Sequence, residues 1–219
     1  MQRSLGLEIV NNIDYTLYLV TDYQSNHSIV TQVKSALSGG VTLVQYRAKL
    51  MTNADVYKEA SEITELMHKA KRPLIINDRV DIAMAVNADG VHLGPEDLPI
   101  SVARRIMGAT AIIGASVSSV EEAIEAESDG ANYLGVGAIY DTVTKSDAGV
   151  GIGVQTITDI KSAVSIPIVG IGGINLFNVS EVIKAGADGV AVVSALTRAK
   201  NITISAKELV TEIKKARSF

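Results

Sequence analysis

The stretch that decides the fold runs from Ile75 to Asp97 and reads IINDRVDIAMAVNADGVHLGPED. It begins in an apolar run, which predicts a strand buried on both faces. Residues 79–86 follow with a helical pattern, and Asn77 and Asp78 are placed to cap that helix. Residues 90–93 then predict a second strand. The stretch therefore predicts one complete strand–helix–strand unit.

Carboxylates follow both strands of this unit. Asp78 comes after the first strand, and Glu96 and Asp97 come after the second. In parallel α/β folds the carboxyl ends of the strands carry the chemistry. Two carboxylates at one edge suit a hard cation such as Mg²⁺, which takes its remaining ligands from water and phosphate. These residues predict a magnesium site at that end of the sheet.

The same alternation extends outward along the whole chain. The expected strands cover residues 17–21, 41–46, 74–76, 90–93, 111–114, 133–136, 167–170 and 189–193. The expected helices cover residues 29–37, 53–71, 79–86, 102–107, 119–128, 155–164, 176–185 and 206–216. At about 27 residues per unit, this pattern predicts an α/β fold, a single (β/α)₈ TIM barrel over residues 1–219. Residues 1–15 would form an extension that covers the barrel.

An internal echo supports the barrel. Residues 39–41, 88–91, 129–131 and 187–190 each end a helix, contain glycine and start an even-numbered strand. We interpret each glycine as a left-handed helix cap, beside a small residue that lets the helix lie close to the sheet. A doubly wound open sheet would use similar turns. The lack of any break in composition favours the closed barrel.

Composition excludes several other classes. Apolar residues make up 47% of the 219 residues and aromatic residues only 4%, which is typical of parallel strands covered by helices. The net charge of −4 without charge blocks argues against a nucleic-acid-binding surface. The absence of cysteine excludes disulfides and thiolate metal sites. No leader pattern or membrane-spanning run is present, so we expect a cytoplasmic protein that does not act at a membrane.

The loops after the second and fifth strands carry candidate ligands. Arg47 and Lys49 lie two residues apart at a strand exit, and together they suit a diphosphate or triphosphate. Two solvated surface charges are an equally good interpretation of that pair. Ser116 offers a hydroxyl beside backbone N–H groups after the fifth strand, although such a residue more often caps a helix.

The loops after the last three strands suggest phosphate binding. Residues 140–149 form the most polar stretch after any strand, which indicates either a lid or a simple surface loop. Residues 170–174 are rich in glycine, and Ser194 follows the eighth strand. In a barrel these last two loops often form a phosphate site from backbone N–H groups. We therefore expect a phosphate site there.

The chain shows no acid–base machinery. His92 lies inside a strand, where we expect it to be buried against a helix in a structural or supporting role. His27 and His68 are expected to be uninvolved, and no serine pairs with a suitable histidine. A reaction with little proton transfer fits this inventory. Loss of diphosphate to leave a stabilised cation, captured by a nucleophile held opposite, is such a reaction.

Five motifs in order resemble the thiamine phosphate synthase family from about residue 17 to residue 196. They are Gln45-Tyr46-Arg47-Ala48-Lys49, Asn77-Asp78-Arg79, Val91-His92-Leu93-Gly94 with Glu96-Asp97-Leu98-Pro99, Thr142-Val143-Thr144-Lys145-Ser146-Asp147-Ala148, and Gly170-Ile171-Gly172-Gly173-Ile174. The resemblance implies an enzyme that joins 4-amino-2-methyl-5-hydroxymethylpyrimidine diphosphate to 4-methyl-5-(2-hydroxyethyl)thiazole phosphate and releases diphosphate. Its partners would be these small molecules, and a homo-oligomer stays open.

The resemblance also implies roles for individual residues. The pyrimidine diphosphate would be held by Gln45, Tyr46, Arg47, Ala48, Lys49, Asn77, Ser116 and Lys145. The thiazole phosphate would be held by Thr142, Val143, Thr144, Gly173, Val193 and Ser194. Asp78 and Asp97 would ligate one Mg²⁺ ion, and the catalytic groups would be Arg47, Lys49, Ser116 and Lys145.

The chain departs from the family pattern at a few positions. Tyr46 replaces a smaller aliphatic residue, Ala48 an acid, Pro95 a glutamine, and Tyr140-Asp141 a Phe-Pro pair. None of these changes removes a charged group assigned to the site. Two other functions stay open: a thiazole tautomerase-type paralogue that forms no carbon–nitrogen bond, and a non-catalytic phosphate-sensing barrel.

Overall fold

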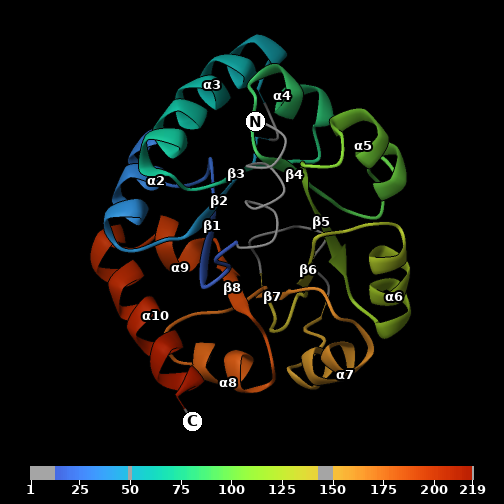
Figure 1. Ribbon diagram of the computed structural model, residues 1–219. Coiled ribbons are helices and arrows are strands. Elements are labelled where there is room, and N and C mark those ends of the chain that lie inside the picture. Colours follow the sequence, from blue (N-terminus) through green and yellow to red (C-terminus); the bar gives the residue numbers. More distant parts are fainter. Residues whose placement is uncertain (1–12, 49–50, 143–149, 219) are drawn as a thin grey trace.

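Eight parallel strands form a closed barrel, and the helices surround it (Figure 1). The computed structural model describes residues 13–48, 51–142 and 150–218. The strands are β1 Leu17–Val20, β2 Leu43–Tyr46, β3 Leu74–Asn77, β4 Gly90–Leu93, β5 Ile112–Val117, β6 Tyr133–Val136, β7 Ile168–Ile171 and β8 Gly189–Val192. Each strand pairs with the next one in the sequence, and β8 closes on β1 through the pair Val190 and Leu17. The predicted TIM barrel is confirmed. Residues 1–12 of the expected extension lie outside the described residues.

The helices follow the strands as predicted, with shifted ends. They are α2 Ile29–Ser38, α3 Asn53–Ala70, α4 Val80–Ala85, α5 Ile100–Met107, α6 Val120–Ser128, α7 Gln155–Ala163, α8 Val179–Lys184, α9 Ser194–Thr197 and α10 Ile202–Arg217. Helix α10 begins earlier than predicted because the Asn201 side chain accepts a hydrogen bond from Ile204 N. Helix α9 was not predicted, since four residues are too short to show a helical period.

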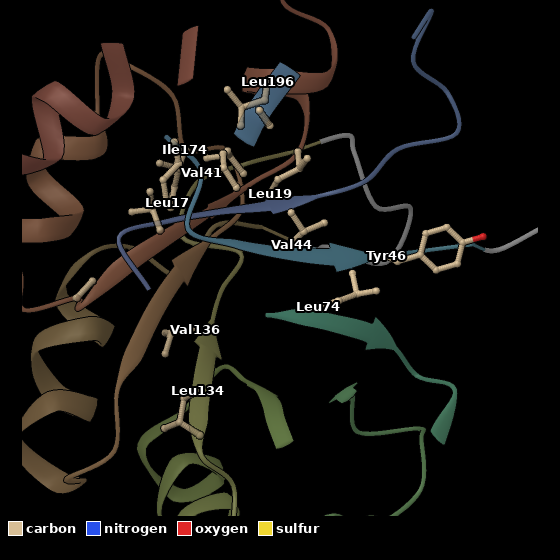
Figure 2. Packing of buried hydrophobic residues seen from close by; sticks show 14 of the residues in the cluster. Leu17, Leu19, Val41, Val44, Tyr46, Leu74, Leu134, Val136, Ile174 and Leu196 are labelled. Carbon is tan, nitrogen blue, oxygen red and sulfur yellow. The ribbon is translucent and has the colours of Figure 1, made fainter. Parts of the chain in front are cut away.

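Side chains of the strands alternate between the barrel interior and the helices. Leu17, Leu19 and Val44 face outward into a large apolar cluster shared with the helices, part of which is seen in Figure 2. Tyr18 and Leu43 belong to a separate interior cluster. Both clusters are buried, which explains why the strands read as continuous apolar runs rather than as an alternation.

A repeated hydrogen-bond pattern, which we call the clasp, closes the amino-terminal end of the barrel. In each clasp a side chain just before or at the start of an even-numbered strand accepts from a backbone N–H of the preceding odd-numbered strand. The four clasps are Leu17 N to Thr42 Oγ1 (3.2 Å), Leu74 N to Asp89 Oδ2 (2.8 Å), Ile113 N to Asn132 Oδ1 (2.8 Å) and Ile168 N to Asp188 Oδ2 (2.8 Å). Backbone N–H groups at strand starts, which would otherwise lack a partner, are thereby satisfied.

The clasps correct our interpretation of the glycine echo. Gly40 and Gly130 do have left-handed backbones, with φ of 99° and 94°. Gly90 and Gly189 do not cap helices. They lie in β4 and β8, where an added Cβ would lie 2.0 Å from Ile112 O and 1.7 Å from Tyr15 O. The echo therefore reflects close strand packing and the clasps as much as helix caps.

None of the helices in the described ranges combines the length and apolarity needed to cross a membrane.

Candidate active site

A cavity of about 580 Å³ lies at the carboxyl end of the barrel, where loops from β2 to β8 meet. Among the residues proposed as ligands, those that line it are Arg47, Asn77, Asp78, Asp97, Ser116, Thr142, Gly173, Val193 and Ser194. Lys49, Val143, Thr144 and Lys145 lie outside the described residues, as do residues 143–149 of the expected lid. The structure thus brings together most of the proposed ligands, while their individual roles stay predictions.

The two carboxylates proposed as metal ligands reach the cavity from neighbouring loops. Asp78 follows β3, and Asp97 follows β4, where its Oδ2 accepts from Gly94 N at 2.7 Å. Glu96 lines the same cavity. No group of three His, Cys, Asp or Glu side chains suited to a metal occurs in the described part of the chain. Two carboxylates fit Mg²⁺, which keeps several water and phosphate ligands, better than a metal that needs a full protein cage.

Asp78 does not cap the following helix, contrary to our expectation. Arg79 occupies the cap position of α4, where capping by a side chain is absent in the described ranges; its guanidinium instead donates to the Asp81 carboxylate, with Nε 2.8 Å from Oδ1. Asp78 itself has a left-handed backbone, with φ of 63°, and its N–H donates to His92 O at 2.9 Å. This turn ties the exit of β3 to β4. Such a conformation is uncommon outside glycine, although Asp adopts it more readily than most residues.

Arg47, which follows β2, brings a positive charge to the cavity. Its backbone N–H donates to Thr21 Oγ1 at 2.9 Å, which fixes the exit of β2 against the exit of β1. The guanidinium can contact two phosphate oxygens at once, which a single ammonium cannot do in the same geometry.

The two neighbours of Arg47 in its motif lie in a different environment from Arg47 itself. Tyr46 belongs to the outer cluster (Figure 2) and is not among the described residues that line the cavity. Its Oη lies 2.9 Å from both Tyr23 Oη and Glu59 Oε2, and Tyr23 also bonds Glu59. Burial is the main cause that raises the pKa of Tyr23 and Tyr46, and the nearby Glu59 carboxylate adds to it. Ala48 packs against the same outer cluster. Ala48 is likewise not among the lining residues, and the implied role of these two residues toward the diphosphate stays a prediction.

Gln45 lies inside the barrel and is almost completely buried. Its Nε2 donates to Tyr18 Oη at 3.0 Å. It therefore lies among the interior side chains, apart from those that line the cavity.

The loop after β7 lines the cavity with glycine backbone. Gly172 and Gly173 have left-handed backbones, with φ of 98° and 66°. A Cβ on Gly172 would lie 2.5 Å from Ala138 Cα, and one on Gly173 would lie 2.7 Å from Tyr140 Cβ. Only glycine fits at these two places. Ser194, at the start of α9, lines the cavity from the next strand.

The two ends of the expected lid are held by side chains. Tyr140 Oη donates to Glu181 Oε2 at 3.0 Å, and burial together with that carboxylate raises the pKa of Tyr140 to about 12. Gly151 N donates to Asp141 Oδ1 at 2.8 Å. The unusual Tyr140-Asp141 pair therefore anchors the loop to α8 and joins its two described flanks.

His92 faces the barrel interior, so the prediction that it packs against a helix is wrong. Val91 and Leu93 face the helices, and strand alternation turns His92 inward. Its Nδ1 lies 2.9 Å from Tyr133 Oη, and its Nε2 lies 2.9 Å from Ser116 Oγ. His92 also lines the cavity beside Ser116, and its supporting role stays a prediction.

Some cavity residues were missed because their sequence signal describes only local structure. Ser119 Oγ accepts from Glu122 N at 3.2 Å, and Glu122 Oε2 accepts from Ser118 N at 2.6 Å. This arrangement resembles a capping box, which predicts the start of α6 but not a cavity wall. Ser118 and Glu122 nevertheless line the cavity.

Comparison with known proteins gives consistent matches over most of the chain. The family model described as thiamine monophosphate synthase matches residues 17–196. A thiamine-phosphate synthase of Clostridium acetobutylicum is 47% identical over 208 residues, which cover 94% of this chain and 98% of the relative. One of Ruminiclostridium cellulolyticum is 49% identical over 201 residues, covering 91% and 95%. The solved structure of a thiamine phosphate pyrophosphorylase from Pyrococcus furiosus has a TM-score of 0.87 at 42% identity, covering 93% of this chain and 98% of that one.

Proposed function

The chain belongs to the thiamine monophosphate synthase family, and from this premise we infer that it joins the aminopyrimidine diphosphate to the thiazole phosphate. The bond between the exocyclic pyrimidine carbon and the diphosphate oxygen breaks, and a bond from that carbon to the thiazole nitrogen forms. The products are thiamine phosphate and diphosphate. One observation carries this function: Arg47, Asp78 and Asp97 share one cavity with the glycine-rich loop after β7 and with Ser194.

We propose that the two substrates lie at opposite sides of the cavity. Arg47, Asn77 and Ser116 would hold the pyrimidine diphosphate, with Lys49 and Lys145 contributing further charge. Thr142, Gly173, Val193 and Ser194 would hold the thiazole phosphate, supported by the backbone wall of the loop after β7. In this arrangement cations would face the diphosphate, and backbone and hydroxyl groups would face the smaller monophosphate.

Asp78 and Asp97 would hold Mg²⁺ beside the diphosphate. When bound, the ion would neutralise the charge that develops on the leaving diphosphate. Asn is a poorer ligand than Asp but keeps the size of the side chain. Asp78→Asn and Asp97→Asn should therefore raise the Mg²⁺ concentration needed for activity and slow turnover in folded protein. Normal turnover and metal dependence in both variants would contradict the proposed metal site.

We propose a dissociative displacement, because joining the two substrates requires no proton transfer. The thiazole nitrogen attacks with a lone pair and carries no proton. The pyrimidine amino group can donate electrons through the ring to the exocyclic carbon as diphosphate leaves. Arg47, Lys49 and Lys145 would stabilise the departing charge. His92→Asn should then cost far less than Lys145→Ala.

Two measurements test the function and its mechanism. Product formation from both substrates, with and without Mg²⁺, tests the activity; a paralogue that only rearranges the thiazole, or a phosphate sensor, would form no thiamine phosphate. An electron-withdrawing substituent on the pyrimidine should slow single turnover by orders of magnitude, because it destabilises the developing cation. An unchanged single-turnover rate would exclude the cationic route.

A further inference from the structure

A line of hydrogen bonds crosses the barrel interior and ends at the cavity. It joins Gln45 on β2, Tyr18 on β1, Tyr133 on β6, His92 on β4 and Ser116 on β5. The contacts are Gln45 Nε2 to Tyr18 Oη (3.0 Å), Tyr18 Oη to Tyr133 Oη (2.9 Å), Tyr133 Oη to His92 Nδ1 (2.9 Å) and His92 Nε2 to Ser116 Oγ (2.9 Å). Of these five, only Ser116 is among the residues proposed as catalytic.

The barrel leaves space for this line by placing glycine opposite its rings. A Cβ on Gly114 would lie 2.2 Å from Tyr133 Cζ, and a Cβ on Gly135 would lie 3.0 Å from His92 Cε1. Tyr18 and Tyr133 are fully buried. Burial raises the pKa of both phenols, so each keeps its proton over the working range of pH. The barrel interior therefore accommodates this line of side chains specifically.

The amide at one end sets the direction of every bond in the line. The Gln45 nitrogen can only donate, so Tyr18 Oη accepts from it. The hydroxyl proton of Tyr18 then has one acceptor within reach, Tyr133 Oη, because the Gln45 nitrogen cannot accept. Without that bond the buried Tyr18 hydroxyl would be an unpaired donor. The Tyr133 proton goes in turn to His92 Nδ1, which must be the unprotonated nitrogen of a neutral ring.

We propose that this line fixes His92 as the tautomer with hydrogen on Nε2 and so makes Ser116 a hydrogen-bond donor to the cavity. His92 Nε2–H donates to Ser116 Oγ, and the Ser116 proton is left for an acceptor on the ligand. Given the proposed function, the matching acceptor is a ring nitrogen of the aminopyrimidine. Tyr18, Tyr133 and His92 are then positioning residues that act through Ser116.

The tautomer can be measured directly on the wild-type enzyme without substrate. The chain has three histidines, so ¹⁵N labelling of histidine gives few signals, and His92→Asn assigns the one of interest. Nitrogen shifts distinguish a ring with hydrogen on Nε2 from the other neutral tautomer and from the imidazolium. We expect hydrogen on Nε2. Hydrogen on Nδ1, as in a line with the Gln45 amide turned over, or a doubly protonated ring, would overturn the proposal. This result does not depend on which reaction the enzyme catalyses.

Tyr133→Phe removes the donor to His92 Nδ1, and Tyr15→Phe is its matched control. Tyr15 packs on Tyr133 with ring centroids 5.0 Å apart, but its hydroxyl has no hydrogen-bond partner in the described part of the chain. Tyr133→Phe should allow both tautomers of His92 and raise KM for the pyrimidine diphosphate about fivefold, with KM for the thiazole phosphate unchanged. Tyr15→Phe should leave both KM values and the tautomer within error of wild type.

Substrate analogues show whether Ser116 is the donor that the line creates. Two analogues of the pyrimidine diphosphate are needed, each with C–H in place of one of the two ring nitrogens. Each analogue lacks one hydrogen-bond acceptor. Wild type should bind one of them about fivefold more weakly than the parent, and Tyr133→Phe should lose most of that discrimination. Equal discrimination by both proteins, or equal losses with Tyr15→Phe, would contradict the proposal. If wild type made no product at all, the proposed function would fail instead, and the tautomer measurement would still stand.

Discussion

The two ends of the barrel use the same residue types in opposite ways. At the amino-terminal end, Asp89 and Asp188 accept hydrogen bonds from backbone N–H groups of neighbouring strands. At the carboxyl end, Asp78 and Asp97 line a cavity. The carboxylates at the amino-terminal end join neighbouring strands, whereas those at the carboxyl end line the cavity, although Asp97 also accepts from Gly94 N within its own loop. Residue type alone therefore does not identify a site; its position along the strand does.

Two arginines, one at each end of the barrel, differ in the same way. Arg104 donates to Ala111 O at 2.6 Å, to Gly130 O at 3.0 Å and to Asn132 Oδ1 at 2.6 Å, and so joins the starts of β5 and β6. Burial lowers its pKa. Arg47 instead lines the cavity. Comparing variants of the two arginines separates stability from activity.

Arg47→Ala should have the largest effect on activity and little effect on stability. Loss of a group that stabilises charge in the transition state typically costs about 10²- to 10³-fold in rate. We expect kcat/KM for the pyrimidine diphosphate to fall by that order, while the unfolding free energy changes by no more than about 0.5 kcal/mol. Steady-state kinetics and urea unfolding measure the two quantities. A loss shared equally by both substrates would mean that Arg47 does not face the diphosphate.

Arg104→Ala should show the reverse. Several hydrogen bonds from a charged, half-buried donor are lost, and the carbonyls they satisfied are left with fewer partners. We expect a loss of about 2 kcal/mol in unfolding free energy, with both KM values within twofold of wild type. Arg105→Ala, at an exposed neighbouring position of α5, is the control and should be neutral. A kinetic defect in Arg104→Ala would show that the two ends are coupled.

Ser194→Ala tests the other side of the cavity at a smaller scale. One hydroxyl to the thiazole phosphate is removed, and hydrogen bonds to charged groups contribute about 1.5 kcal/mol or more. KM for the thiazole phosphate should rise about tenfold, while that for the pyrimidine diphosphate should stay the same. A rise in KM for the pyrimidine diphosphate alone would show that we have assigned the two substrates to the wrong sides of the cavity.

Asp89→Asn should give the smallest effect, and its sign depends on pH. Burial raises the pKa of Asp89, and the hydrogen bond from Leu74 N–H and the nearby His68 only partly oppose it. A raised pKa means that the folded state disfavours the ionised carboxylate, so this charge lowers stability at neutral pH. Asn keeps an oxygen for Leu74 N and carries no charge. The variant should therefore be slightly more stable than wild type at neutral pH. The difference should shrink as pH falls through the raised pKa toward the ordinary carboxyl value. Urea unfolding across that range measures it; a difference that grows on acidification would contradict the assigned cause.

Periodicity and strand order could be predicted from the sequence because they depend on local patterns. The strands of the barrel were found since each is a short apolar run bounded by turn residues. The cavity residues were found because a closed parallel barrel brings every strand exit to one end. Arg47, Asp97 and Ser194 are brought together by topology alone, although they are far apart in the chain.

The directions of individual side chains could not be predicted in the same way. Tyr46 on β2 and His92 on β4 are both polar ring side chains within apolar runs, yet His92 turns inward and Tyr46 turns toward α3. Their orientation depends on which alternate residues face the helices, and continuous apolar runs hide that alternation. The clasps were missed for a related reason, because their partners belong to different strands. The short α9 and the cap position of α4 depend on local geometry that no sequence pattern marks.

The clasps also bear on the order in which the barrel assembles. They join residues 25, 15, 19 and 20 positions apart, so each closes a short loop. The contact of β1 with β8, by contrast, requires the two ends of the chain to meet. Because short loops lose less entropy on closure, we expect four strand pairs to form early and the seam between β1 and β8 to form last. Native-state hydrogen exchange should then find the amides of this seam among the first to open, ahead of those inside each clasped pair.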